Sequence, residues 1–267
     1  MGGVVQAKAK MNLNVDLINL TCVTPLKIFG ANFAFGAVLP VGGTRVRASA
    51  TAIVPKLTLL KTTIPISIPV FLPTSVSRSK HQSANGIADM LIAPCMLGWH
   101  YKNFHSLLFL GGFLPTGKYN KHHIANMGTG HGAIETDFGV TWLSPELGSE
   151  VSVYTGLTMN LNNHKLHYKS GTEWHTEFFL GQNFTCGLEV GFAGYYYKQI
   201  TGDYGKGAVL GGFRGRVFGI GPALLYTFKK GTIPITTNLR YYCESSARNH
   251  FRGHSVYLTV ALPIAAF

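Results

Sequence analysis

The sequence predicts an all-β protein, a transmembrane antiparallel β-barrel of about 12 strands (12–14) with up-and-down topology, long extracellular loops and short periplasmic turns. First, polar and apolar residues alternate with a period of two, as they do when successive side chains point to opposite faces of a strand. Second, several alternating segments exceed the ~9–11 residues that a tilted strand needs to cross a bilayer. Third, short and long connectors alternate along the chain, which is typical of membrane barrels.

Composition excludes two other classes of protein. The chain has 267 residues, of which 46% are hydrophobic, 12% aromatic and only 13% charged, with a net charge of +12. A disordered chain would be poorer in aromatic residues. A helical membrane bundle needs about 20 consecutive apolar residues per span, whereas the longest apolar stretch, 62–76, contains Pro65, Pro69 and Pro73, which break helices.

The clearest alternation lies in residues 149–161. Its odd positions carry Val151, Val153 and further apolar residues up to Leu161, and its even positions are mostly small or polar. Turn signals, among them Gly42 and Gly43, divide the chain into about twelve segments of this kind. The expected strands are 11–24, 28–41, 44–55, 86–101, 104–115, 132–144, 149–161, 172–183, 187–200, 212–228, 232–243 and 254–267.

The alternation also predicts which side chains line the barrel interior. In lipid every backbone polar group must be paired, so a sheet closes on itself and its polar faces point to the lumen. Charges of both signs can then pair across the lumen. The polar positions are Asn12, Asn14, Asp16, Arg45, Arg47, Glu135, Asp137, Asn160, His175, Glu177, Glu189, Asn238 and Arg240. The candidate substrate and lumen residues are Arg45, Arg47, Glu135, Asp137, Asn160, Glu177, Glu189, Tyr195, Tyr197, Gln199, Arg216 and Arg240.

Seven stretches of the chain, in order, resemble the meta-pathway of phenol degradation family of bacterial outer-membrane β-barrel proteins. They lie at 24–30, 88–100, 115–119, 160–171, 194–203, 211–222 and 248–253, so the resemblance covers nearly the whole chain. The most specific is GGFRGRVFGIGP at 211–222. The resemblance implies a transporter-like barrel, related to long-chain fatty-acid channels, that admits hydrophobic or aromatic compounds.

The two ends of the chain carry separate expectations. Residues 1–267 are expected to form a single outer-membrane β-barrel domain that lacks an N-terminal signal peptide and a first strand, because similar proteins begin further upstream. The terminal Phe267 resembles the C-terminal aromatic residue that the barrel-assembly machinery recognises. Its phase is imperfect, since residues 256–264 place their apolar side chains at even positions.

No motif predicts catalysis, a metal or a cofactor. The histidines at 122–123, 164, 167, 250 and 254 fit solvated loops, and spacing alone does not bring a nucleophile such as Ser152 to His175. Nucleic-acid binding is not expected either, because Lys and Arg are dispersed instead of forming one basic face. Many of them lie in expected loops, where they could contact the phosphates of outer-membrane lipid and lipopolysaccharide.

The sequence therefore favours a passive channel in the bacterial outer membrane that takes up small hydrophobic or aromatic solutes. One alternative is a structural or adhesive outer-membrane barrel with a plugged lumen and basic polysaccharide-binding loops. A second alternative is a soluble β-protein, which would be monodisperse without detergent.

Overall fold

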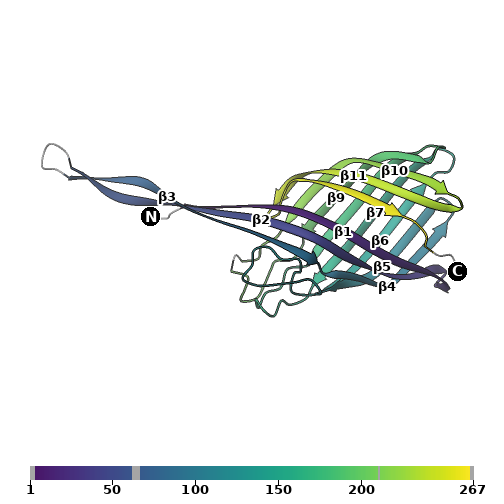
Figure 1. Ribbon diagram of the computed structural model, residues 1–267, viewed down its shortest axis with the longest axis horizontal. Coiled ribbons are helices and arrows are strands. Elements are labelled where there is room, and N and C mark those ends of the chain that lie inside the picture. The colour runs from purple at the N-terminus through teal and green to yellow at the C-terminus, as the bar shows by residue number, and fades with distance from the viewer. Residues whose placement is uncertain (1–3, 62–66, 210, 265–267) are drawn as a thin grey trace.

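The computed structural model describes residues 4–61, 67–209 and 211–264, and these ranges form a single antiparallel sheet that curls into a barrel wall (Figure 1). The predicted fold class and strand number are confirmed, with twelve strands in the described ranges. The strands are β1 (Val4–Ile28), β2 (Ala31–Lys61), β3 (Ser67–Ile87), β4 (Met90–Tyr101), β5 (Phe104–Leu114), β6 (Ala133–Leu143), β7 (Ser149–Asn160), β8 (Glu173–Asn183), β9 (Leu188–Gln199), β10 (Arg216–Lys230), β11 (Ile233–Arg248) and β12 (His254–Ala261).

The sheet order follows the chain, β1-β2-β4-β5-β6-β7-β8-β9-β10-β11-β12, and β3 pairs with β2 beside this path. Strands β4 to β9 have 11 or 12 residues each, enough for a tilted strand to cross a bilayer. Within the described ranges, no ladder joins β1 to β12. No helix in that part of the chain is long and apolar enough to cross a membrane.

Burial alternates along the wall, as the sequence pattern predicts. In β7, Val151, Val153, Leu157 and Met159 are exposed, and the intervening positions are half-buried or buried. We call the first side of the sheet the outer face and the second the inner face. The outer face is apolar on successive strands because the register places Val153 beside Val140 of β6 and Phe178 of β8.

The prediction of a turn at Gly42 and Gly43 is wrong. Both glycines lie inside β2, which runs without a break from Ala31 to Lys61, and neither adopts a positive φ. Their lack of side chains serves a close approach of strands, because a Cβ on Gly42 would lie 2.1 Å from the Asn14 carbonyl oxygen of β1. The sequence signal for a turn was therefore a signal for tight strand packing.

Other strand boundaries also differ from the prediction. Residues 67–87, expected mainly as a connector, form β3, where Pro69 and Pro73 pair with β2. Among the described strands β3 pairs only with β2, and proline is tolerated in such an edge strand. The strand expected at 86–101 is interrupted at Ala88 and Asp89. The strand expected at 254–267 is described as β12 up to Ala261, and Phe267 lies outside the described residues.

As a result, β2 and β3 project far beyond the barrel as a long hairpin, with part of β1 alongside (Figure 1). The long loops gather at the same end of the barrel (Figure 1). The loop between β5 and β6 packs against the base of this ribbon, where Ile124 N donates to Gln82 Oε1 (2.9 Å) and Lys80 Nζ donates to the His122 carbonyl (3.2 Å).

Asp89 holds the same loop to the barrel. Its buried carboxylate accepts hydrogen bonds from Gly117 N (2.9 Å), Thr129 N (2.7 Å) and Thr129 Oγ1 (2.7 Å). Gly117 leaves the space for this contact, since a Cβ there would lie 2.9 Å from Asp89 Oδ1 and 2.7 Å from Gly128 Cα. The break between β3 and β4 thus anchors the loop between β5 and β6.

Candidate functional site in the barrel interior

Acidic side chains and a histidine meet on the inner face of β6, β7 and β8. Glu135 and Asp137 lie two residues apart on β6, so both side chains share the inner face, and they are only 7% and 4% exposed. The register aligns Asp137 with Gly156 of β7 and Gly156 with His175 of β8. One cross-strand row therefore carries an acid, a glycine and a histidine.

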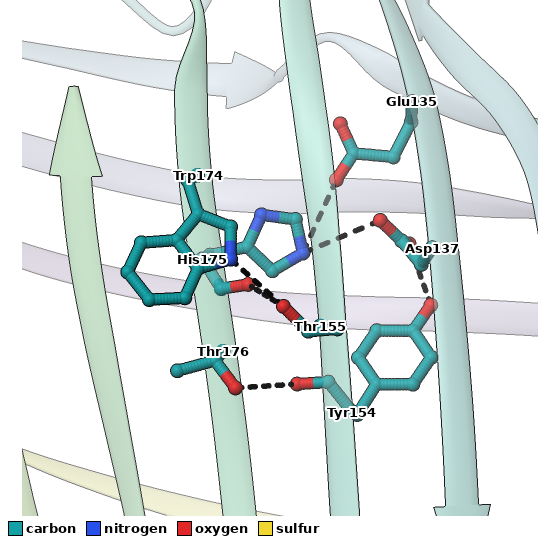
Figure 2. Close-up of polar contacts among 7 residues, drawn as sticks. All are labelled: Glu135, Asp137, Tyr154, Thr155, Trp174, His175 and Thr176. Carbon is teal, nitrogen blue, oxygen red and sulfur yellow. Dashed lines mark hydrogen bonds and ion pairs between the residues drawn. The ribbon is translucent and has the colours of Figure 1, made fainter. Parts of the chain in front are cut away.

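The glycine lets the acid and the histidine approach each other. His175 Nε2 lies 3.3 Å from Asp137 Oδ1 and 3.6 Å from Glu135 Oε1 (Figure 2). A Cβ on Gly156 would lie 1.7 Å from Asp137 Oδ1 and 2.9 Å from His175 Nε2. Any side chain at this position would displace one of the two groups.

Neighbouring hydrogen bonds fix the cluster. Tyr154 Oη donates to the second carboxylate oxygen of Asp137, Oδ2, at 2.6 Å (Figure 2). Thr155 Oγ1 donates to the His175 carbonyl (3.0 Å), and Trp174 Nε1 donates to Thr155 Oγ1 (2.9 Å). The His175 carbonyl and the side chain of the preceding Trp174 are thereby tied to Thr155 of β7.

A second polar network lies closer to the long loops. Asn160 Nδ2 donates to Glu173 Oε1 (2.9 Å), and Gln199 Nε2 donates to Asp203 Oδ1. In the loop between β7 and β8, Tyr168 Oη donates to Asp203 Oδ2 (2.6 Å). Burial, followed by this hydrogen bond, raises the pKa of Tyr168 from 10.0 to about 12.

A cavity of ≈ 560 Å³ lies on the side of the cluster that faces the short turns. Residues from β1, β2, β4 to β8 and β11 line it, so strands distant in the sequence contribute to its walls. Its lining is largely apolar and aromatic, with Phe179, Tyr154 and Leu107 among its members, and it also holds Glu177 and Arg240. This is the size and character of a site for a small organic molecule.

Aromatic side chains continue the apolar wall of the interior. Phe179 and Tyr242 are buried in one cluster, against which Tyr195 packs, and Tyr195 meets Tyr242 edge to face at 5.2 Å between ring centroids. Arg240 lies over the Phe179 ring at 5.8 Å, within the range of a cation–π contact. Tyr195 Oη also donates to Glu244 of β11.

The structure places nine of the twelve candidate lumen residues on the inner face. The strand register places all of them on the same side of the sheet as the cavity-lining Tyr154 and Phe179. They are Glu135, Asp137, Asn160, Glu177, Glu189, Tyr195, Tyr197, Gln199 and Arg240.

The predicted lumen positions of Arg45, Arg47 and Arg216 are wrong. Arg45 and Arg47 are exposed on β2, whereas the intervening Thr44 and Val46 are buried and share their phase with the cavity-lining Asn32 and Ala34. Residues 12, 14 and 16 of β1 face the same outer side, because Asn12 pairs with Arg45. The hairpin of β2 and β3 projects beyond the barrel, where no lumen lies on one side of the strands (Figure 1). Its polar side chains therefore need not point to the inner face.

Arg216 lies on the outer face for a related reason. Its neighbour Val217 is only 1% exposed and occupies the inner face, and Arg216 pairs with Lys198 and Arg248 across β9, β10 and β11. These side chains and Arg214 line a small pocket of ≈ 240 Å³ next to the long loops. Arg216 lies next to the long loops, beyond the apolar band of the outer face, so its charged side chain can point outward there.

The contact between His175 and the two acids was missed by the sequence analysis, which placed all three on polar faces without joining them. The available signal was the Glu-x-Asp spacing on one strand, followed two strands later by an inner-face histidine. Ser152 does not contact His175 in a catalytic arrangement. Its hydroxyl instead bonds Glu150 Oε1 (2.7 Å) and Thr141 Oγ1 (2.8 Å).

The fold is that of an antiparallel membrane-barrel wall with a polar and aromatic interior. The chain belongs to the family described as "Putative MetA-pathway of phenol degradation", whose model matches residues 1–260. Among solved structures, a similar fold occurs in the crystal structure of an outer membrane channel from Pseudomonas putida F1, with a TM-score of 0.55 and 10% sequence identity over 97% of this chain and 92% of that chain. No curated protein sequence matches significantly.

Proposed function

We propose that this protein is a channel in the bacterial outer membrane through which small hydrophobic or aromatic compounds diffuse passively inward. The observation that carries the proposal is the interior cavity of ≈ 560 Å³, bounded by opposing walls and lined by aromatic and apolar groups. The family membership and the fold shared with an outer membrane channel support it.

The outer face supports the membrane location. Large apolar side chains are exposed on successive strands, for example Phe138 (46%), Val153 (47%), Leu180 (49%) and Phe192 (61%). A water-soluble protein rarely exposes so continuous an apolar surface, whereas a barrel in lipid requires one.

The interior supports the substrate class. Phe179 and Tyr154 offer ring faces and edges to an aromatic solute, while Arg240 and Glu177 supply charges of opposite sign at the same cavity. A barrel of this size is mostly filled by its own side chains or holds one small ligand. This favours small solutes over the general permeability of a wide porin, and it needs no catalytic group.

Basic residues on the outer face support a proposal about the partners of the barrel. Lys198, Arg216 and Arg248 pair directly across three strands on the outer face, and like charges in such pairs destabilise a sheet unless an anion lies between them. We propose that this rim contacts lipopolysaccharide phosphates and that the barrel-assembly machinery inserts the chain. Reversal of Arg216 to Glu should lower the lipopolysaccharide retained on purification.

The alternative is a plugged structural or adhesive barrel. The firmly anchored loop between β5 and β6, with Ala125 and Met127 buried, is the observation in its favour. Flux into liposomes decides between the two. We expect the refolded chain to admit phenol and a short fatty acid much faster than a charged sugar of similar size; equal retention of all three by folded protein would favour the plugged barrel.

A further inference from the structure

The cluster of Glu135, Asp137 and His175 has the donor atoms of a metal site. One imidazole nitrogen and two carboxylate oxygens lie within 4.8 Å of one another. The His175 distances of 3.3 and 3.6 Å are long for hydrogen bonds of this type. They match the separation of about 3.4 Å between ligand atoms around a tetrahedral ion with bonds of about 2.1 Å.

The two carboxylates are only partly compensated. Among the described residues, neither has an ion pair with a lysine or an arginine, and His175 is the one basic group close to both. Glu135 Oε2 and Asp137 Oδ1 are buried without a hydrogen-bond partner. Since buried negative charge is costly unless it is fully paired, a cation bound between the carboxylates would lower this cost.

The surroundings bring the ligand atoms together and orient them. A Cβ on Gly156 would lie 1.7 Å from Asp137 Oδ1 and 2.9 Å from His175 Nε2, so the glycine is what lets these two groups approach each other. Tyr154 donates to Asp137 Oδ2, which directs Oδ1 toward the histidine. Outer hydrogen bonds of this kind orient the ligands of metal sites.

We propose that Glu135, Asp137 and His175 bind one divalent transition-metal cation on the inner wall of the barrel. A mixed set of imidazole and carboxylate ligands suits zinc and its first-row neighbours, and water can complete the coordination. The site lies on β6 and β8, on the side of the cavity that faces the long loops. The cation therefore changes the wall charge beside the route to the cavity.

The test is binding of Co²⁺, followed by the visible absorption of the bound ion, to the full chain folded in detergent, with displacement by Zn²⁺. We expect one ion per chain in the micromolar range or tighter. His175→Gln and Asp137→Asn should weaken binding at least tenfold. Gly156→Ala should weaken it as well, although it retains every ligand.

His105→Asn is the matched control. His105 and His100 form a separate histidine pair, with 2.8 Å between their Nδ1 atoms, so this variant should bind like the wild type. Unboiled gel mobility verifies that each variant is folded. The proposal is overturned if folded wild type binds no Co²⁺ below millimolar concentration, if His105→Asn instead of His175→Gln abolishes binding, or if Gly156→Ala binds with unchanged affinity. If His175→Gln does not fold, Glu135→Gln and Gly156→Ala replace it in the test. Weaker Co²⁺ binding by these two variants supports the proposal, and unchanged affinity overturns it.

Discussion

The hydrogen bond from Tyr154 to Asp137 makes a quantitative prediction. Tyr154→Phe removes the donor of a 2.6 Å bond to a carboxylate whose side chain is 5% exposed, while the ring is retained. Hydrogen bonds to charged groups contribute about 1.5–3 kcal/mol. We therefore expect a loss of about 2 kcal/mol in the free energy of unfolding, or roughly a 30-fold change in the unfolding equilibrium.

A double-mutant cycle isolates this bond. In an Asp137→Ala background the Tyr154 hydroxyl has no carboxylate partner, so Tyr154→Phe should cost less than about 0.5 kcal/mol. The assay is urea unfolding in phospholipid vesicles, followed by tryptophan fluorescence and analysed for midpoint and slope.

Tyr196→Phe serves as the control, because Tyr196 meets Trp174 edge to face at 5.6 Å on the opposite side of the sheet. Its loss should leave stability nearly unchanged. Our reasoning would be refuted if Tyr154→Phe cost the same in both backgrounds, or no more than Tyr196→Phe.

Three further predictions concern other parts of the molecule. Asp89→Ala removes three hydrogen bonds from the loop between β5 and β6, so trypsin should cleave at Lys118 at least about tenfold faster than in the wild type, and an unchanged rate would contradict the anchoring role. Because Arg240 and Glu177 line one cavity, Arg240→Gln should shift the reversal potential toward cation selectivity and Glu177→Gln toward anion selectivity; identical shifts would argue against this cavity as the ion path. The pKa of Tyr168 rises from 10.0 to about 12, so the stability it contributes is present below pH 10 and is lost as the pH rises through 12; Tyr168→Phe should remove this part of the alkaline loss of loop protection against proteolysis.

The barrel strands could be predicted because one physical constraint dominates them. Residues 149–161 must expose apolar groups to one side and polar groups to the other, and the exposed Val151, Val153, Leu157 and Met159 of β7 follow this alternation. The same constraint identified Glu135, Asp137 and Asn160 as inner-face residues.

The projecting hairpin could not be predicted by the same reasoning. Beyond the barrel the two faces of a ribbon no longer separate lipid from lumen, so the alternation around Arg45 does not indicate which side is interior. Gly42 and Gly43 were ambiguous as well, because glycine serves both turns and close strand contacts.

The candidate site depends on register, which the sequence analysis did not establish. Whether His175 meets Asp137 is decided by the pairing of both residues with Gly156. A shift of one residue in either ladder would turn one of them to the outer face. The sequence therefore predicted the chemical groups and their face, and the structure was needed for their contacts.

Single-channel recording in planar lipid bilayers tests the central claim most directly. The refolded chain, shown to be folded by its faster migration without boiling, should produce discrete current steps, and Arg240→Gln should change their ion selectivity. Folded protein that inserts into the bilayer but gives neither current steps nor solute flux would contradict the channel account and indicate a sealed barrel.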